Sequence, residues 1–194
     1  MLKRWKKIRQ EFEFKNPWWT YRKDEVLLPN GKQGEYHFVH VIGSSMIIPI
    51  REDGKLIMVN QYRYLLDRES LEFPCGGIKR GSTYEETAEH ELIEETGFRA
   101  TRMEAVGDHN PYNGVTDEMS RVFIARDLVP ADMEHDETEE FEQVYLTATE
   151  LENKIAVGEI WDGMSLASWA LARRRVLAIL REMGIEQPDS RIAE

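Results

Sequence analysis

One stretch of this chain, residues 76–98, combines the marks of a helix with a large excess of negative charge. Ser82 or Thr83 can act as the N-cap, each with a glutamate three residues on to complete a capping box, and Gly97 can end the helix in the left-handed conformation. Between Ser82 and Gly97 stand six glutamates and no lysine or arginine. The stretch therefore predicts a strongly acidic helix over about residues 84–96.

The charge on this predicted helix is self-repelling. Glutamates three or four residues apart, such as Glu91 and Glu94, each cost about 0.2–0.5 kcal/mol as like-charge neighbours. Glu94 and Glu95 also fall in the last turn, where the helix dipole favours a cation. A solvated acidic face accounts for the acids of the first turn but less well for these three, whose neighbouring carboxylates suit a hard divalent cation. We therefore predict a Mg²⁺ or Mn²⁺ site on Glu91, Glu94 and Glu95.

Composition and charge narrow the class of protein. A chain of 194 residues is long enough for one domain with additions. Its formal net charge of -11 argues against sequence-independent nucleic-acid binding, which needs lysine and arginine to neutralise phosphates. Cys75 is the single cysteine, which excludes an intramolecular disulfide, and no apolar run approaches membrane-spanning length. The basic start of the chain runs into EFEFKN instead of an apolar signal core, so we expect a soluble cytoplasmic protein with no nucleic-acid or membrane partner.

Turn and strand signals indicate the fold class. A first hairpin is predicted within residues 20–40, where PNG separates two alternating runs, and a second within residues 46–64, turning at DG. Residues 1 to about 13 favour a basic amphipathic helix or a loose arm. Strands mixed with flanking helices indicate an α/β sandwich, whose remaining elements are expected to be strands near 101–107, 120–125 and 143–147, a short helix at 150–157 and a longer helix at 164–183 stopped by Gly184.

Gly76 and the run ELIEETGF at residues 91–98 stand at the spacing of the Nudix hydrolase signature, which this chain resembles. Two positions depart from that signature, because Ser82 stands where the family has glutamate and His90 where it has arginine. In the family these two side chains pair and brace the loop against the helix. A hydrogen bond between Ser82 and His90 is expected to take the place of that ion pair.

Three further segments narrow the resemblance. GKLIMVNQYRY, ESLEFPCGGI and EEFEQVYL are similar to the ADP-ribose pyrophosphatase branch, which hydrolyses nucleoside diphosphate sugars. The resemblance implies a Nudix α/β/α sandwich with a mixed central sheet and an N-terminal β-hairpin extension. It divides the chain into an arm and hairpin at 1–41 that we expect to dimerise, a hydrolase domain at 42–184 and a flexible tail at 185–194.

The resemblance also implies which residues hold metal and move the proton. In that branch the backbone carbonyl at the Cys75 position joins Glu91 and Glu95 on two or three Mg²⁺ or Mn²⁺ ions, with Glu94 as a catalytic residue close behind. A carboxylate on a mobile loop before the last core strand then acts as the base, within hydrogen-bond reach of the attacking water. A merely solvated acidic loop is the competing interpretation. The candidate loop is EHDETEEFE at residues 134–142, where we expect Glu137 as the base, Glu139 as a further metal ligand and Glu140 as the alternative base.

Substrate contacts are implied in other parts of the chain. Arg63, at the end of an apolar strand, is implied as a phosphate or ribose contact, and an exposed strand-end arginine is the alternative. Trp18, Trp19 and Tyr21 are expected either to stack on a purine across a homodimer with swapped N-terminal strands, as in the branch, or to form interface core. The sugar-facing side of the pocket is expected to involve His109 and the loop at 110–118, with Gly114 and with Asn113 where the branch has proline.

These features predict a metal-dependent hydrolase that cuts the diphosphate bond of a nucleoside diphosphate sugar, such as ADP-ribose, into a nucleoside monophosphate and a sugar phosphate. The alternative is a Nudix domain that has lost catalysis and binds a nucleotide as a sensor or regulatory module, which the departures at Ser82 and His90 suggest. Retention of Glu91, Glu94 and Glu95 together with an acidic loop favours the enzyme.

Overall fold

The computed structural model describes residues 2–132 and 142–185, which belong to two compact units. Unit 1 is built from the stretch up to residue 43 together with residues 110–119. Unit 2 is built from residues 44–109 and from residue 120 onward. The loop at 110–118 therefore belongs to the same unit as the N-terminal strands. The predicted tail beyond residue 185 lies outside the described residues.

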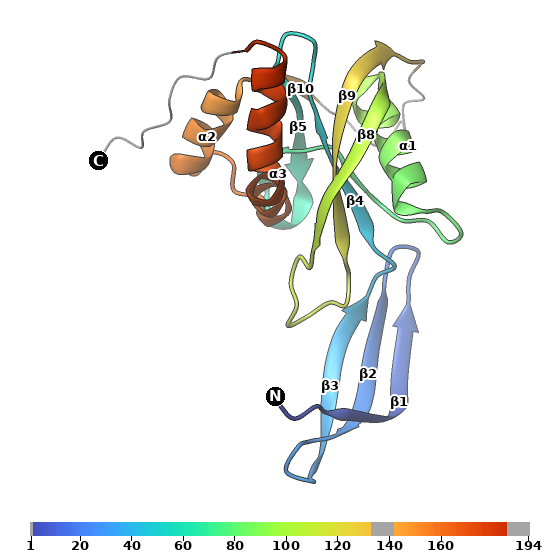
Figure 1. Cartoon of the computed structure of the whole chain (residues 1–194). Helices are drawn as coiled ribbons and strands as arrows, with labels where there is room; N and C mark the ends of the chain where they lie inside the picture. The colour runs from blue at the N-terminus through green and yellow to red at the C-terminus, as the bar shows by residue number, and fades with distance from the viewer. Residues whose placement is uncertain (1, 133–141, 186–194) are drawn as a thin grey trace. The chain divides into compact units, whose positions relative to one another are not determined.

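Unit 1 is a three-stranded antiparallel sheet in the order β1-β2-β3. The predicted turn between the second and third strands is confirmed, because Gly31 has a φ of 80° and its amide donates to Leu28 O at 2.9 Å. Residues 110–119 join the third strand through a parallel bridge between Val39 and Thr116. The strands are β1 (Lys6–Lys15), β2 (Thr20–Leu27) and β3 (Gln33–His40), drawn in shades of blue in Figure 1.

The expectation of a helix or a loose arm at the start of the chain is wrong, because β1 is a strand paired along β2. Apolar and charged residues alternate in EFEFK at the end of β1, and this period of two suits a strand. Ion pairs cross the two strands, from Lys7 to Asp24 at 2.7 Å and from Arg9 to Glu25 at 2.7 Å. The N-terminal extension therefore consists of the predicted hairpin, β2 and β3, with β1 added as a third strand.

Unit 2 contains a mixed four-stranded sheet in the order β7-β4-β9-β8 and an antiparallel sheet in the order β10-β5-β6. In the mixed sheet β4 and β9 run parallel, and the other neighbours run antiparallel. The three late strands predicted from the sequence are all present. The strands of unit 2 are β4 (Ser44–Pro49), β5 (Leu56–Arg63), β6 (Arg68–Glu72), β7 (Cys75–Gly77), β8 (Phe98–His109), β9 (Ser120–Pro130) and β10 (Glu142–Leu146).

The predicted turn at Asp53 and Gly54 is present, with Gly54 at a φ of 80°, but the hairpin around it is not. β4 and β5 share only an isolated bridge between Ile50 and Leu56 and then enter different sheets. Both edges of β4 are occupied, by β7 on one side and by β9 on the other, so β5 pairs with β6 and β10. Local sequence marks the turn, whereas the packing of the whole unit decides the strand partners.

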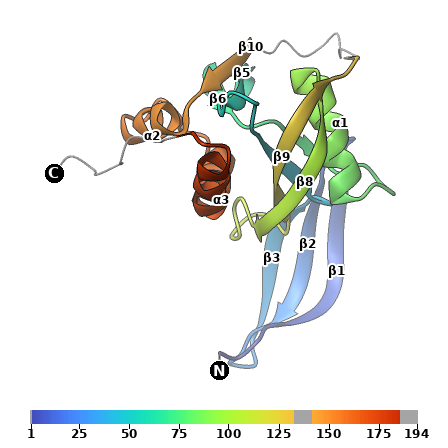
Figure 2. The same ribbon diagram turned by 45° about the horizontal axis from the view of Figure 1, so that its top comes forward.

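The mixed sheet is covered on both faces, which confirms the α/β/α sandwich. Side chains of β4 alternate between the faces: Ile47 packs with Ala88 and Leu92 of the acidic helix, whereas Met46 and Ile48 belong to the cluster on the other face. Figures 1 and 2 both show α1 and α3 on opposite faces of this sheet. The helices are α1 (Tyr84–Thr96), α2 (Ala148–Ala156) and α3 (Gly163–Glu182), with a 3₁₀ turn η1 (Tyr64–Leu66) between β5 and β6.

The acidic helix α1 begins and ends where its sequence predicts. Thr83 is the N-cap: its hydroxyl accepts from Glu86 N at 3.1 Å, and the Glu86 carboxylate accepts from Thr83 N at 2.8 Å. The hydrogen bonds that the Glu86 carboxylate accepts from the backbone N–H and the hydroxyl of Thr83 lower the pKa of Glu86. Gly97 ends the helix at a φ of 68°. Among the described helices, none has both the length and the apolar character needed to cross a membrane.

Candidate active site

The site predicted on α1 starts from a close contact between Glu91 and the short strand β7. A Cβ built on Gly76 would lie 2.0 Å from both Cδ and Oε1 of Glu91, which leaves room for hydrogen alone. The Glu91 carboxylate therefore lies directly on the backbone of β7, the strand that also carries Cys75. Strand β7 and helix α1 are separated by a loop in the sequence, and they can approach this closely because Gly76 has no side chain.

Glu94 lies beside Glu91, and His90 lies with them. One ligand atom from each of these three side chains falls within a group whose members are all within 4.8 Å of one another. Glu95 is on the buried side of the helix, with 5% of its surface exposed, and does not belong to that group. The structure thus brings together two of the three predicted carboxylates, Glu91 and Glu94, and places the third in the interior of unit 2.

The hydrogen bond expected between Ser82 and His90 is not formed. His90 Nδ1 lies 3.0 Å from Glu94 Oε2, one helical turn further on. Ser82 instead donates its backbone N–H to Lys79 O at 3.0 Å, within the loop before the helix. In a helix rich in carboxylates, the imidazole meets a glutamate at the i+4 position more easily than a hydroxyl eight residues earlier.

The residues of this region fit a divalent cation such as Mg²⁺ or Mn²⁺. Carboxylate oxygens are the hard donors that both ions accept, and α1 presents Glu91 and Glu94 side by side. The cradle that Gly76 makes for Glu91 brings backbone of β7 next to this carboxylate, as a site with a carbonyl ligand from Cys75 requires. The thiol of Cys75 is not needed for that role, because the proposed ligand is the backbone carbonyl. The backbone of Cys75 is held in place by its pairing with Met46 of β4.

Arg63, predicted to contact substrate, is held by a carboxylate that the sequence does not single out. Its Nε donates to Glu72 Oε1 at 2.7 Å and its Nη2 donates to Glu72 Oε2, a fork-to-fork pair. This hydrogen bonding raises the pKa of Arg63, and only 4% of Glu72 is exposed. Arg63 is the last residue of β5 and Glu72 is the last residue of β6, the neighbouring strand. No local pattern in the sequence predicts that they pair.

The aromatic residues predicted to stack on a base belong to unit 1. Trp18 and Trp19 form the turn between β1 and β2, where Asn16 Oδ1 accepts from their two backbone N–H groups at 2.9 and 2.8 Å. Trp18 is 80% exposed, so its ring is accessible in this unit. Tyr21 lies in β2, and its hydroxyl is 2.6 Å from His37 Nδ1.

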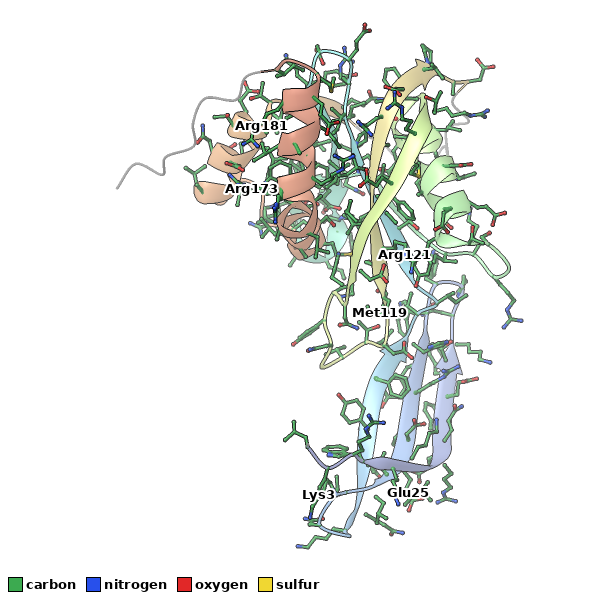
Figure 3. The ribbon with its side chains drawn as sticks, in the orientation of Figure 1. Lys3, Glu25, Met119, Arg121, Arg173 and Arg181 are labelled. Carbon is green, nitrogen blue, oxygen red and sulfur yellow. The ribbon has the colours of Figure 1, made fainter. Side chains whose placement is uncertain are left out.

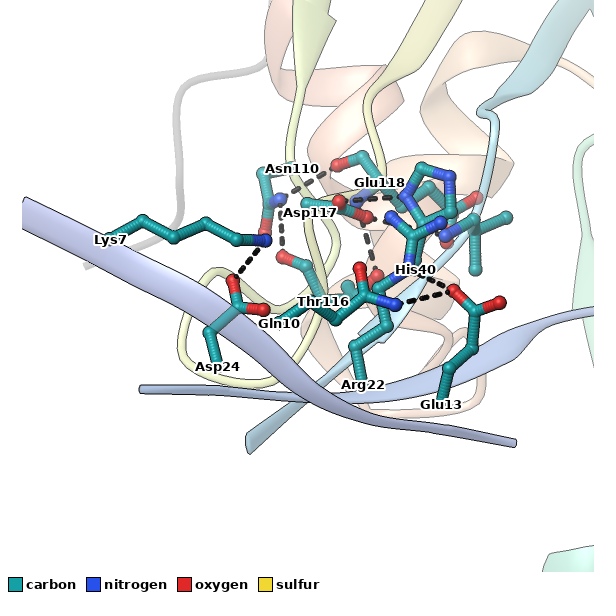
Figure 4. A network of polar contacts seen from close by, with 11 residues as sticks. Lys7, Gln10, Glu13, Arg22, Asp24, His40, Asn110, Thr116, Asp117 and Glu118 are labelled. Atoms are coloured by element: carbon teal, nitrogen blue, oxygen red, sulfur yellow. Dashed lines mark hydrogen bonds and ion pairs between the residues drawn. The ribbon is translucent and has the colours of Figure 1, made fainter. Parts of the chain in front are cut away.

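The loop at 110–118 is tied to β3 by a polar network, seen from close by in Figure 4. His40 Nδ1 lies 2.8 Å from Asp117 Oδ2, and Asp117 Oδ1 accepts from Val41 N at 3.2 Å. Asn110 Nδ2 donates to the backbone carbonyls of Thr116 and Glu118 at 3.1 and 2.7 Å, which closes the loop on itself. Between these anchors Asn113 and Gly114 are exposed at the tip.

The predicted base loop gives no further geometry. Glu137, Glu139 and Glu140 lie outside the described residues. Described chain resumes at Glu142, the first residue of β10. The following residue, Gln143, donates through its side-chain amide to Thr96 O at 3.0 Å, so β10 contacts the C-terminal end of α1.

Comparison with known proteins identifies the family. Residues 40–164 match the NUDIX domain family. The chain belongs to the Nudix family. Residues 5–39 match a second family, the nucleoside diphosphate sugar hydrolase N-terminal domain. This Nudix hydrolase therefore carries an N-terminal module that has a family of its own, and that module covers the three strands of unit 1.

Named relatives and a solved structure are similar to most of this chain. A Bacillus subtilis protein called ADP-ribose pyrophosphatase is 33% identical over 141 residues, covering 72% of this chain and 76% of that protein. A Bacillus methanolicus protein called methanol dehydrogenase activator is 31% identical over 145 residues, covering 74% and 78%. The crystal structure of an ADP compounds hydrolase superposes with a TM-score of 0.82 at 22% identity, covering 93% of this chain and 98% of that one. At that identity the structural likeness shows the fold.

Proposed function

We propose that this Nudix hydrolase cleaves the diphosphate bond of a nucleoside diphosphate sugar, with ADP-ribose as the first substrate to test, into a nucleoside monophosphate and a sugar phosphate. The observation that carries the proposal is the close contact of the Glu91 carboxylate with the backbone at Gly76, with Glu94 beside Glu91. The matching N-terminal family, whose description names nucleoside diphosphate sugar hydrolases, supports the substrate class. The relatives named ADP-ribose pyrophosphatase support the choice of sugar nucleotide.

In the proposed site Glu91, Glu94 and Glu95 of α1 and the Cys75 carbonyl hold two or three Mg²⁺ or Mn²⁺ ions. The chemistry that divalent ions supply in such a site is neutralisation of phosphate oxygens and a lowered pKa of bound water. Glu95 is buried, and a metal ligand that is buried on one side is fixed in direction by its packing. Glu139 is proposed as a further ligand from the loop before β10.

The protein's own groups orient the diphosphate and move the proton. Arg63 is proposed to donate to a phosphate oxygen through Nη1, which makes no hydrogen bond to any described residue while Nε and Nη2 bind Glu72. Glu137, with Glu140 as the alternative, is proposed to take a proton from the attacking water. The water oxygen then bonds to one phosphorus, the bond from that phosphorus to the bridging oxygen breaks, and the second phosphate leaves.

We also propose a homodimer in which unit 1 provides the contact. Large side chains on its strands are exposed, among them Phe12 and Phe14 of β1 at 52% and 55%. Trp18, Trp19 and Tyr21 then stack on the base of the substrate or pack in the interface, and Asn113 and Gly114 face the sugar. The molar mass in solution, measured by light scattering, tests the dimer. Location in the cytoplasm stays a prediction.

A substrate panel tests the proposed function. ADP-ribose, GDP-mannose and UDP-sugars are incubated with the protein and either Mg²⁺ or Mn²⁺, and a phosphatase that acts on monoesters converts the products to free phosphate. Release of phosphate that depends on both the protein and the metal is expected for at least one sugar nucleotide. Binding of these compounds without turnover of any of them would contradict the proposal and favour the sensor interpretation.

A further inference from the structure

One row of residues crosses the mixed sheet of unit 2 from edge to edge on the side of α1. Gly76 of β7 pairs with Ser45 of β4, Ser45 pairs with Arg121 of β9, and Arg121 pairs with Asp108 of β8. Paired neighbours in a sheet direct their side chains to the same face. Ser45 and Arg121 have the same parity as Ile47 and Phe123, which pack in the cluster that contains Ala88 and Leu92 of α1.

Three members of this row, Gly76, Ser45 and Arg121, contact α1. Gly76 supports the Glu91 carboxylate, as described above. Ser45 Oγ donates to the backbone carbonyl of Tyr84, the first residue of the helix, at 2.7 Å. The Arg121 guanidinium carbon lies 4.6 Å from the centroid of the Tyr84 ring.

Asp108 holds Arg121 in that position. Arg121 Nε and Nη2 donate to the two Asp108 oxygens at 2.8 and 3.2 Å, which leaves Nη1 directed to Glu85 Oε1 at 3.7 Å. Figure 3 labels Arg121 near the start of β9 and beside the start of α1. The guanidinium thus links a fixed carboxylate on the sheet to the first two residues of the helix.

These polar contacts are directional, whereas the remaining contacts between α1 and the sheet are apolar. Ala88 and Leu92 pack against Ile47 and Phe123, and such apolar contact is not directional, so it resists separation of helix and sheet more than sliding. A hydrogen bond to the Tyr84 carbonyl and a cation stacked on its ring fix the start of α1 along its axis. Glu91 lies seven residues, about two turns, further along the same rigid helix.

Sliding of α1 along the sheet would displace Glu91, because its carboxylate is in close contact with the backbone at Gly76. We propose that Arg121 is a positioning residue that sets the register of α1 against β7, and so the placement of Glu91 and Glu94 for divalent cations. The inference rests on the proposed function, since it assumes that these carboxylates bind the metal. Arg121 touches neither metal nor substrate and acts through Tyr84 and Glu85.

The matched control is Arg175, which fixes a different helix to the same sheet. Its guanidinium forms a forked pair with Glu104 of β8, at 3.0 Å from Nε to Oε1 and from Nη2 to Oε2. The side chains of Arg175 and Glu104 are 35% and 42% exposed, against 33% and 42% for Arg121 and Asp108. Removal of either arginine therefore breaks an ion pair of similar burial, but only Arg121 contacts α1.

The experiment measures the dissociation constant of Mn²⁺ by calorimetry for wild type, Arg121→Gln, Arg121→Lys and Arg175→Gln, with thermal unfolding of each variant. Arg121→Gln is expected to weaken Mn²⁺ binding by about tenfold, the lower end of the loss seen when groups that orient metal ligands are removed. Arg175→Gln is expected to lower the melting temperature similarly and to bind Mn²⁺ as wild type does. Arg121→Lys, which keeps the charge but not the planar fork, is expected to fall between wild type and Arg121→Gln.

Wild-type affinity in both Arg121 variants, or an equal loss of affinity in Arg175→Gln, would overturn the positioning role while leaving the proposed function intact. Failure of the wild-type protein to bind Mn²⁺ would instead overturn the metal site itself, and with it this inference. If Arg121→Gln does not fold, the comparison of Arg121→Lys with Arg175→Gln decides, because a positioning role requires the lysine variant alone to lose affinity.

Discussion

The carboxylate of Glu91 occupies the place where a side chain on residue 76 would begin, with Oε1 and Cδ both 2.0 Å from that point. This contact couples strand β7 to the face of α1 that carries the acids. Like-charge neighbours on that face cost stability in the absence of a cation. The structure therefore presents a strained set of acids in a fixed place, which is the arrangement that a metal site needs.

Gly76→Ala tests the coupling directly. The added methyl group must displace Glu91 or the helix, so we expect a loss of about 1–3 kcal/mol of stability, as for other overpacked sites, together with weaker Mn²⁺ binding. Gly77→Ala is the control, because a Cβ there meets nothing within 4 Å. Urea unfolding and Mn²⁺ titration measure both effects. Equal behaviour of the two alanine variants would show that the close contact does not exist in solution.

Glu91→Gln and Glu95→Gln are each expected to remove most of the activity without unfolding the protein. Without metal, a neutral amide at residue 91 relieves the repulsion between Glu91 and Glu94, so the melting temperature of metal-free Glu91→Gln should stay level or rise. The rise in melting temperature that added Mn²⁺ causes should shrink, because that rise follows from binding to the folded state. Near wild-type turnover by either variant would contradict its assignment as a metal ligand.

Glu137→Gln is expected to lower kcat by about 10² to 10⁴, the usual worth of a general base, with little change in KM. A base acts in the transition state and contributes little to binding of the substrate. Glu139→Gln and Glu140→Gln are compared under the same conditions by steady-state kinetics. A large loss in Glu140→Gln beside a small one in Glu137→Gln would transfer the role of base to Glu140.

The pair of Asp108 and Arg121 predicts a pH dependence of stability. Hydrogen bonding to Arg121 lowers the pKa of Asp108 below its usual value of about 4. An aspartate whose pKa is lower in the folded than in the unfolded state stabilises the folded protein at pH values above its unfolded-state pKa. This contribution is lost as the pH falls through the folded-state pKa. Asp108→Asn should therefore melt below wild type at pH 7, with a difference that shrinks in acid below about pH 4. A difference that stays constant down to pH 3 would argue against the pair.

The parts of the fold that local sequence determines could be predicted, and the parts that depend on distant partners could not. Helix α1 follows from Thr83, Glu86 and Gly97, which cap it through neighbours in the chain. The turn at Gly54 was equally visible, but its strands have partners elsewhere, so the predicted hairpin was wrong. The basic residues of β1 favour a helix or a loose arm, whereas the alternation in EFEFK indicates the strand that the structure has.

The same distinction holds for the site. Glu91 and Glu94 could be predicted as neighbours because helical spacing alone places them on one face. The partner of Arg63, Glu72, depends on the register of β5 with β6, and the row from Gly76 to Asp108 depends on the register of four strands. The predicted hydrogen bond from His90 to Ser82 is wrong, because Glu94, one helical turn away, is the partner of the imidazole.

Product analysis of ADP-ribose hydrolysis tests the central claim most directly. Wild type and Glu91→Gln are incubated with ADP-ribose over a range of Mn²⁺ or Mg²⁺ concentrations, with a chelator as the metal-free control, and the products are separated by anion exchange. The account predicts AMP and ribose phosphate in equal amounts from wild type only when metal is present, and a large loss of both from Glu91→Gln. Hydrolysis by wild type in the presence of the chelator, or equal rates from the two proteins at every metal concentration, would contradict it.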